Sequence, residues 1–287
     1  MPQDLGPVGL RLGRLCEQPM DGIRPAPSYP GIERIEARFQ GDAYAMHRHD
    51  TYALGVTLQG VQRFRYRGAE RASLPGNVIV LHPDEAHDGG AATPAGLHYR
   101  MLYLEPALLL QALGDRKALP FVPMPVLEDA GLRDALLAAL GPLAETLEPL
   151  FVDDLLAQLA DGLARHAGPG ERPAGGLAWR QVHCVRDHLI ANACRAVGSA
   201  ELEAVSGLDR YSLARQFRAV FATSPHRFHI MRRLQQARSL IAAGAALADT
   251  AAATGFADQS HLTRHFKKAY GVTPGRWAAL VAAGQRA

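Results

Sequence analysis

Near the end of the chain, hydrophobic and polar positions alternate with a helical period. Between residues 258 and 270 the apolar side chains recur at i, i+4, i+7 and i+8, namely Leu262, Phe266, Ala269 and Tyr270. The opposite side carries hydroxyl groups and positive charge, from Ser260, Arg264, Lys267 and Lys268, flanked by Thr263. This spacing predicts an amphipathic helix that begins after an Asp258 cap and ends at Gly271. A solvated charged face is the plain alternative for such a surface.

The pattern occurs a second time, 49 residues earlier. Asp209 matches Asp258, Leu213 matches Leu262, and the same offset joins Arg215 to Arg264, Phe217 to Phe266, and Pro225 to Pro274. Each copy follows a shorter helical run and a glycine turn, at residues 202–207 and 247–255. That order is typical of a helix-turn-helix unit. A helical solenoid is the alternative, but two copies are too few to bury a solenoid core.

A third apolar helical pattern, over residues 225–243, joins the two copies. Nineteen residues of helix span about 28 Å at ~1.5 Å per residue, close to the ~34 Å between major-groove segments on one face of B-DNA. We therefore predict two units that dock in successive major grooves. The candidates for base-edge contacts are Tyr211, Arg215, Gln259, Ser260, His261 and Arg264, and those for phosphate contacts are Arg218, Lys267 and Lys268.

The last hundred or so residues resemble the AraC/XylS family of transcriptional regulators. The resemblance rests on Gly255-Phe256, Gln259-Ser260, Phe266-Lys267-Lys268 and Gly271-Val272-Thr273-Pro274, with Arg233-Leu234, Ala237 and Leu240-Ile241 in the joining helix. Three positions depart from the family pattern: Thr250, Glu203 and Leu262. The resemblance implies double-stranded DNA as a partner, a plausible homodimer, and RNA polymerase as a further partner of an activator.

Charge divides the chain in the same way. Of 31 Lys and Arg and 28 Asp and Glu residues, 15 and 6 lie from residue 177 onward, a net charge of +9. The remainder has 16 basic and 22 acidic residues, a net charge of −6. Basic clustering on one domain is the electrostatic footprint of a DNA-binding protein.

The front half has a different period. Residues from about 32 to 104 read as short strands between turn residues, for example Phe64 and Tyr66 alternating with arginines before Gly68. Many short strands at such intervals predict a β-barrel or jelly roll. Residues 129–166 then read as helical, with an apolar stripe from Leu147 to Leu163 that packs on the barrel or forms a dimer seam.

Three histidines are the candidate chemistry of this half. His47 and His49 lie at i and i+2, on one face of a strand, and His87 stands eleven residues after Gly76. The arrangement resembles the cupin barrel, where an HxH pair and a later histidine converge on one metal, although Ala53-Leu54 occupies the place of the usual glutamate. It is closest to the sugar-binding cupin type that precedes AraC-type DNA-binding domains, which implies a small-molecule sensor.

Two interpretations of the three histidines stay open. Imidazoles suit a divalent metal such as zinc, iron, nickel or copper, whereas the default is that they line a ligand pocket. The candidate ligand-binding residues are His47, His49, Tyr52, Tyr66, His87 and Arg100. No cofactor is certain, and no phosphate-binding glycine loop or hydrolase motif is present in the sequence.

Length favours two domains for these 287 residues. We predict a cupin-like effector-binding domain at 1–125, a helical connector at 126–167, a linker at 168–176 and a double helix-turn-helix domain at 177–287. Three scattered cysteines, Cys16, Cys184 and Cys194, argue against a disulfide framework, and no membrane span or secretion signal is recognisable. A reducing cytoplasm fits these features.

The sequence thus predicts an α+β protein that regulates transcription in response to a small molecule and is not an enzyme. A metal-dependent cupin enzyme with a helical interaction tail is the rival. A DNA-binding protein whose barrel serves only dimerisation is a third hypothesis. The internal repeat, the basic tail and the missing glutamate favour the regulator.

Overall fold

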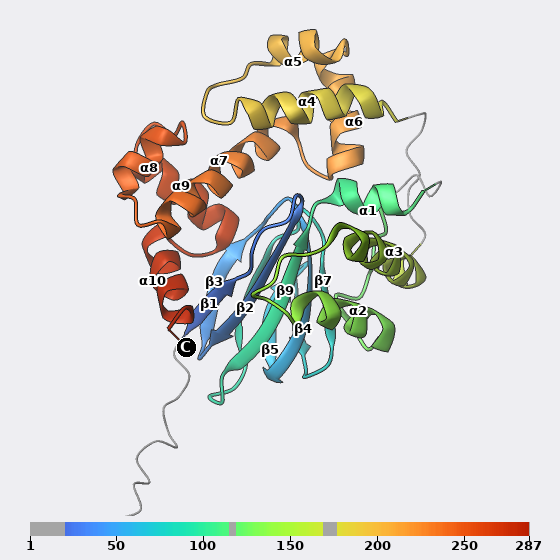
Figure 1. Cartoon of the computed structure of the whole chain (residues 1–287), viewed down its shortest axis with the longest axis vertical. Helices are drawn as coiled ribbons and strands as arrows, with labels where there is room; N and C mark the ends of the chain where they lie inside the picture. Colours follow the sequence, from blue (N-terminus) through green and yellow to red (C-terminus); the bar gives the residue numbers. More distant parts are fainter. Residues whose placement is uncertain (1–20, 115–118, 169–176, 287) are drawn as a thin grey trace, which may run out of the picture.

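The computed structural model describes residues 21–114, 119–168 and 177–286. Its first half contains two antiparallel sheets packed against each other (Figure 1). The six-stranded sheet has the order β1-β2-β9-β4-β7-β10, with β1 Gly22–Pro25, β2 Ile32–Phe39, β9 Leu97–Leu104, β4 Tyr52–Gly60, β7 Val78–Leu81 and β10 Val126–Leu127. The four-stranded sheet has the order β3-β8-β5-β6, with β3 Asp42–His47, β8 His87–Ala91, β5 Gln62–Tyr66 and β6 Ala69–Ser73.

Strand alternation explains how the sheets bury their faces. In β5 the side chains of Phe64 and Tyr66 are buried, whereas Arg63 and Arg65 are exposed. In β9, Tyr99 and Met101 join the core between the sheets, and Leu102 and Leu104 join a second core on the outer face. The predicted barrel or jelly roll is therefore confirmed.

Three helices cover that outer face: α1 Pro106–Ala112, α2 Ala130–Leu140 and α3 Pro149–His166 (Figure 1). The apolar stripe of α3 is buried here, since Leu155, Leu159 and Leu163 belong to the core that contains strand β4. Of the two uses foreseen for this stripe, packing on the barrel is the one observed. The segment expected as a connector also supplies β10, which pairs with β7.

The second half is all helical, as predicted. A first unit contains α4 Trp179–Ala191, α5 Ser199–Ser206 and α6 Arg210–Phe221, and a second contains α8 Leu247–Ala253, α9 Gln259–Tyr270 and α10 Pro274–Gly284. The long helix α7 Pro225–Ala242 joins them (Figure 1). Most of the predicted linker, residues 169–176, lies outside the described residues.

The second helical unit and the barrel share one core. Leu280 and Val281 of α10 belong to the same buried cluster as Ile23 and Ile35 of the six-stranded sheet. Backbones approach closely at this contact, because a Cβ on Gly284 would lie 2.4 Å from the carbonyl oxygen of Ile23. The first unit has a separate core, whose one barrel-side member is Ala107.

Arginines of α7 add ion pairs to the barrel. Arg232 bridges Asp50 at 2.9 Å and Glu105 at 2.6 Å, and it is buried. Arg227 pairs with Asp84, and Arg238 pairs with Glu33. The joining helix is therefore held against the sensor half along much of its length.

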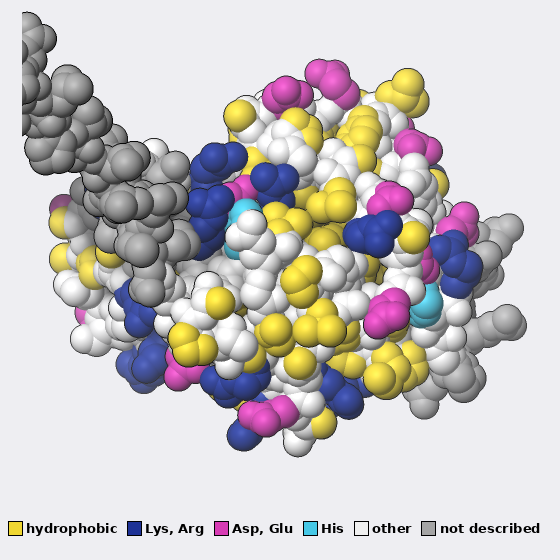
Figure 2. Space-filling model, turned by 90° about the horizontal axis from the view of Figure 1, so that it is seen from below, with side chains coloured by type: hydrophobic (Ala, Val, Ile, Leu, Met, Phe, Trp, Pro, Cys, Tyr) yellow, Lys and Arg dark blue, Asp and Glu magenta, His cyan; other side chains and the backbone are white. Residues whose placement is uncertain are grey.

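The face seen from below Figure 1 mixes basic and acidic side chains around an apolar centre (Figure 2). None of the described helices has the length and hydropathy needed to cross a bilayer.

Candidate DNA-reading helices and the histidine cluster of the barrel

Helix α6 presents the first set of candidate DNA contacts. The Asp209 carboxylate caps it by accepting hydrogen bonds from the backbone N–H groups of Tyr211 and Ser212, both at 3.0 Å. Its stripe of Leu213, Phe217 and Val220 is buried in the core of the first unit. The side chains of Tyr211, Arg215 and Arg218 are exposed, and that of Tyr211 is 66% exposed.

Helix α9 repeats this arrangement. The Asp258 carboxylate accepts a hydrogen bond from the His261 backbone N–H at 2.7 Å, and Gly271 ends the helix in the left-handed conformation. The stripe of Leu262, Phe266 and Ala269 is buried. The exposed side chains are Gln259, Ser260, Arg264, Lys267 and Lys268, and no ion pair to another described residue occupies the three cations.

His261 differs from the other candidates on α9. Its side chain is half-buried, and its Nδ1 accepts a hydrogen bond from the Ala257 N–H at 3.3 Å. The ring also packs against Phe256 and His265. Part of its hydrogen-bonding capacity is therefore used within the protein.

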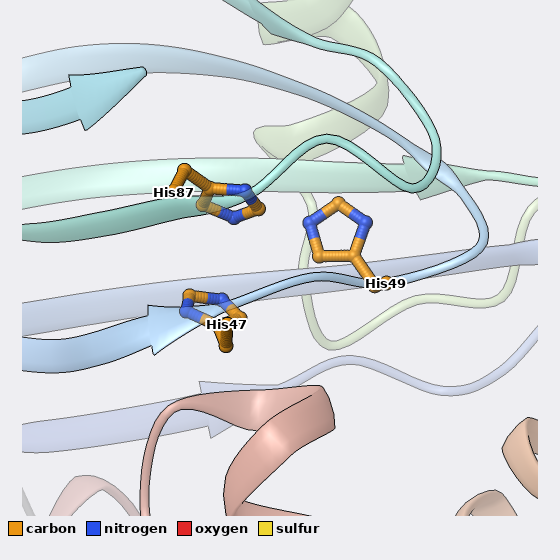
Figure 3. A group of neighbouring side chains, drawn as sticks. All are labelled: His47, His49 and His87. Atoms are coloured by element: carbon orange, nitrogen blue, oxygen red, sulfur yellow. The ribbon is translucent and has the colours of Figure 1, made fainter. Parts of the chain in front are cut away.

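The barrel brings His47, His49 and His87 together (Figure 3). His47 ends β3 and pairs in register with His87 at the start of β8, and His49 lies in the turn before β4. The ring centroids of His47 and His87 are 4.3 Å apart, and those of His49 and His87 are 4.8 Å apart. One ligand atom from each residue lies within 4.8 Å of the others.

Each ring is oriented in the same way by a backbone carbonyl two residues away. The Nδ1 atoms of His47, His49 and His87 lie 2.8, 2.9 and 3.0 Å from the carbonyl oxygens of Ala45, Thr51 and Glu85. A carbonyl only accepts, so Nδ1 carries the proton and Nε2 keeps its lone pair. The Nε2 of His49 is buried and has no hydrogen-bond partner among the described residues.

Burial keeps the three rings uncharged. It lowers the pKa of His47 to about 3 and that of His87 to about 4, and it lowers the pKa of His49 well below its usual value. The neighbouring imidazoles lower the pKa of His47 and His49 further. A neutral imidazole is the form that ligates a metal, so three nitrogen ligands with further positions open are chemically available here. In the described part of the chain, no other His, Cys, Asp or Glu group has such a geometry.

The structure does not bring two of the other predicted ligand residues, Tyr52 and Arg100, to this cluster. Tyr52 lies two residues from Leu54 on β4, and Arg100 lies two residues from Leu102 on β9. Their side chains therefore point to the outer face of the sheet, as those of the two leucines do. The Tyr52 hydroxyl donates to the Pro120 carbonyl at 3.0 Å, and the Arg100 guanidinium binds Glu36 and the Leu140 carbonyl. Tyr66 of β5 pairs in register with His87 of β8, so it lies beside the cluster, but its hydroxyl is 2.8 Å from Nδ1 of a different histidine, His82.

Residues absent from our predictions surround the histidines instead. The Tyr103 ring lies edge-on to His49 at 5.3 Å, and the Tyr44 ring lies 5.7 Å from His47. Both line a cavity of about 70 Å³ between the barrel and the second helical unit, together with Arg238. Strand alternation could have identified Tyr103, because it lies four residues after the buried Tyr99 on β9 and so points to the same face of the sheet. Only the tertiary structure could add Arg238.

Two family models match the chain. Residues 29–160 match the AraC-like ligand binding domain, and residues 202–279 match a helix-turn-helix domain. The HTH-type transcriptional regulator YbfI of Bacillus subtilis is 27% identical over 244 residues, which cover 79% of this chain and 86% of that protein.

Solved structures show the same fold at low identity. ToxT from Vibrio cholerae has a TM-score of 0.63 at 12% identity, with 88% of this chain and 99% of that chain covered. A ToxT structure with a bound unsaturated fatty acid has a TM-score of 0.61 at 12% identity, covering 91% of this chain and 95% of that one. The comparisons favour a regulator over a cupin enzyme. The two domain models, which match successive parts of the chain, and the curated relative together support an AraC-family transcriptional regulator with an N-terminal AraC-like ligand binding domain and a C-terminal helix-turn-helix domain.

Proposed function

We propose that α6 and α9 enter successive major grooves of one DNA duplex, and that a small molecule bound by the N-terminal half controls this interaction. The supporting observation is the duplicated geometry, in which each helix buries one face and turns hydrogen-bond donors outward. Helix α7 has 18 residues, about 27 Å of helix, against ~34 Å between successive groove segments.

The proposed contacts are divided by their place on each helix. Base edges are contacted by Tyr211 and Arg215 on α6 and by Gln259, Ser260, His261 and Arg264 on α9. Arg218, Lys267 and Lys268 lie in the last turns and grip phosphates. Arginine pairing with guanine through two hydrogen bonds is the commonest specific contact, so Arg264 is the sharpest test.

Arg264→Ala should lower the affinity for the selected operator by ~1–3 kcal/mol and relax the preference at one base pair. The operator is first obtained by selecting random duplexes with the full chain at fixed salt, since phosphate contacts make affinity strongly salt-dependent. Arg133→Ala removes the same charge from the barrel cover, where Arg133 pairs with Asp134, and should leave the motif unchanged. An unaltered motif and affinity for Arg264→Ala would reject the assignment.

The effector is a small molecule in this proposal, and its identity is to be found by ligand screening. ToxT bound to an unsaturated fatty acid is a protein of the same fold with a small molecule in it. Candidate ligand contacts are His47, His49 and His87 with Tyr44 and Tyr103, which line the cavity at the domain junction or contact its walls.

We further infer a homodimer, RNA polymerase as the partner if the protein is an activator, and a cytoplasmic location beside the chromosome. The buried stripe of α3 is not available as the dimer seam, so another surface must supply it. Sedimentation equilibrium of the full chain with and without operator DNA tests the assembly. A strictly monomeric complex on a single half-site would reject the dimer.

A further inference from the structure

We propose that His47, His49 and His87 bind a divalent transition metal, and that its occupancy is transmitted through strand β3 to the DNA-reading helix α9. This rests on the proposed function in one respect, because DNA affinity is the readout of the second step.

The site is built for a metal by its surroundings. In metal sites the second ring nitrogen of a histidine is typically held by a carbonyl or carboxylate, which fixes the tautomer and the ring orientation. All three Nδ1 atoms have such a carbonyl partner at 2.8–3.0 Å. The buried Nε2 of His49 lacks any partner among the described residues, and a metal ion would satisfy it.

Binding requires a small movement of these rings. Metal–nitrogen bonds of ~2.0–2.1 Å in a tetrahedral site place ligand nitrogens about 3.4 Å apart, whereas the present ligand atoms are separated by up to 4.8 Å. The pairing of β3 with β8 shifts register between Tyr44 and His47. The two residues between these pairs, Ala45 and Met46, have no partner in the β8 ladder, so this stretch of β3 can adjust when the His47 ring moves toward the metal.

The end of β3 is also where the barrel holds α9. Ala45 N–H donates to the Gly271 carbonyl at 3.0 Å, and Arg48 N–H donates to the Lys268 carbonyl at 3.3 Å. The last carbonyls of a helix have no partner within the helix, so an edge strand of the barrel supplies the missing donors.

The backbone of α9 approaches β3 closely at this junction. A Cβ on Gly271 would lie 2.6 Å from the Ala45 carbonyl oxygen and 2.8 Å from Nδ1 of His47. Because this close approach is combined with the two hydrogen bonds to α9, we expect movement of His47 or Ala45 to be passed to the last turn of the helix. That turn carries Lys267 and Lys268, the proposed phosphate contacts of this helix.

The first experiment measures metal binding by the full chain. Protein stripped with a chelator is titrated with Co²⁺, followed by its visible absorption spectrum and by equilibrium dialysis. We expect one Co²⁺ per chain, and an affinity at least about tenfold weaker in His49→Ala. The control is His261→Ala/His265→Ala, because these two rings lie 4.7 Å apart on α9 and are another pair able to hold cobalt. Binding that survives His49→Ala but is lost in the double variant overturns the site.

The second experiment measures coupling by fluorescence anisotropy with operator DNA. In the wild type, Co²⁺ should change the DNA Kd at least about fivefold, and saturating DNA should change the Co²⁺ Kd by the same factor. Ala45→Pro removes one N–H donor to α9 but keeps the Ala45 carbonyl that orients His47, so it should still bind one Co²⁺ per chain while reducing the effect to less than about twofold. Ala45→Ser keeps the donor and should behave as the wild type.

The outcomes separate the two proposals. One bound Co²⁺ with an unchanged DNA Kd overturns the coupling and leaves the regulator intact. Metal-free protein that selects no DNA motif, and gains none with Co²⁺, contradicts the proposed function itself. The reciprocal Co²⁺ titration uses only the wild type, so it decides the coupling even where Ala45→Pro does not fold.

Discussion

At the scale of single residues, the buried arginine of α7 joins the two halves of the protein. The Arg232 guanidinium contacts Asp50, which is 3% exposed, and Glu105, and it stacks over the Phe228 ring at 4.5 Å. A buried ion pair adds little net stability, but the loss of one partner leaves an uncompensated charge in the interior. The contact therefore fixes the relative position of the halves.

Arg232→Ala should lower the free energy of unfolding by about 3–5 kcal/mol, because Asp50 would stay buried without its cation. Urea unfolding followed by circular dichroism measures this loss. Arg133→Ala breaks an exposed pair and should cost less than ~1 kcal/mol. Equal losses in the two variants would contradict the proposed role of Arg232.

Protonation of His82 should make stability depend on pH. Burial, helped by Arg67, lowers the pKa of His82 to about 4, against ~6.5 in an unfolded chain. Below about pH 6.5 the unfolded chain therefore binds a proton that the folded chain excludes. The contribution of His82 is complete above that pH and is lost as the pH falls toward 4, by up to ~1.4 kcal/mol per pH unit.

Replacing His82 should flatten this dependence. His82→Gln should lose less unfolding free energy between pH 7 and pH 5 than the wild type does, as measured by urea unfolding at both values. The exposed His226 on α7 provides the control, since His226→Gln should keep the wild-type slope. The same slope in His82→Gln would show that His82 is not protonated on unfolding.

At the scale of elements, the two DNA-reading helices α6 and α9 differ in what lies against their C-terminal ends. Both end in the left-handed conformation, α6 at Ala222 with φ 55° and α9 at Gly271 with φ 71°. An alanine is thus accepted at this cap in the first unit. The second unit has the barrel strand β3 against its cap, and a Cβ there would meet backbone. Position 271 therefore requires glycine mainly because strand β3 lies so close, and less because of its left-handed backbone conformation.

Gly271→Ala should consequently destabilise the protein more than Gly207→Ala. Both glycines have positive φ, at 71° and 68°, and each substitution carries ~1–2 kcal/mol of left-handed strain. Only the Cβ at 271 also meets neighbouring atoms, which adds an overpacking cost of ~1–3 kcal/mol. Thermal or urea unfolding of the two variants would contradict this account if their losses were equal.

At the scale of the whole molecule, cores cut across the division into sensor and DNA-binding halves. The second helical unit shares its core with the barrel, whereas the first unit has its own. Cooperative units of local unfolding follow packing. We therefore expect the barrel and the second unit to open together.

Leu280→Ala in α10 should weaken hydrogen-exchange protection in β1 and β2 as well as in the second unit, because Leu280 lies in the shared core. Leu202→Ala in α5 removes a similarly buried side chain, 8% against 6% exposed, and should leave the barrel strands protected. Mass-spectrometric exchange on both variants tests this. Unchanged protection of β1 and β2 in Leu280→Ala would separate the two cores.

The sequence by itself determined the local elements of this protein. The 3.6-residue period placed α6, α7 and α9, the aspartates Asp209 and Asp258 marked two helix starts, and the HxH spacing placed His47 and His49 near each other. These features depend on neighbours in the chain, through backbone hydrogen bonding, capping and strand alternation. The family motifs in the second unit likewise lie within one short segment.

Tertiary structure alone decided which faces meet. Tyr52 and Arg100 are polar residues on strands of the barrel, but the alternation of side chains along these strands points them to the outer face. There they bind α2 and the adjoining loops. Arg232 meets Asp50 across 182 residues, and Ala45 meets the end of α9. No local period encodes such contacts, because they result from the packing of finished elements. The proposed route from the histidine cluster to the DNA is therefore visible only in the folded chain.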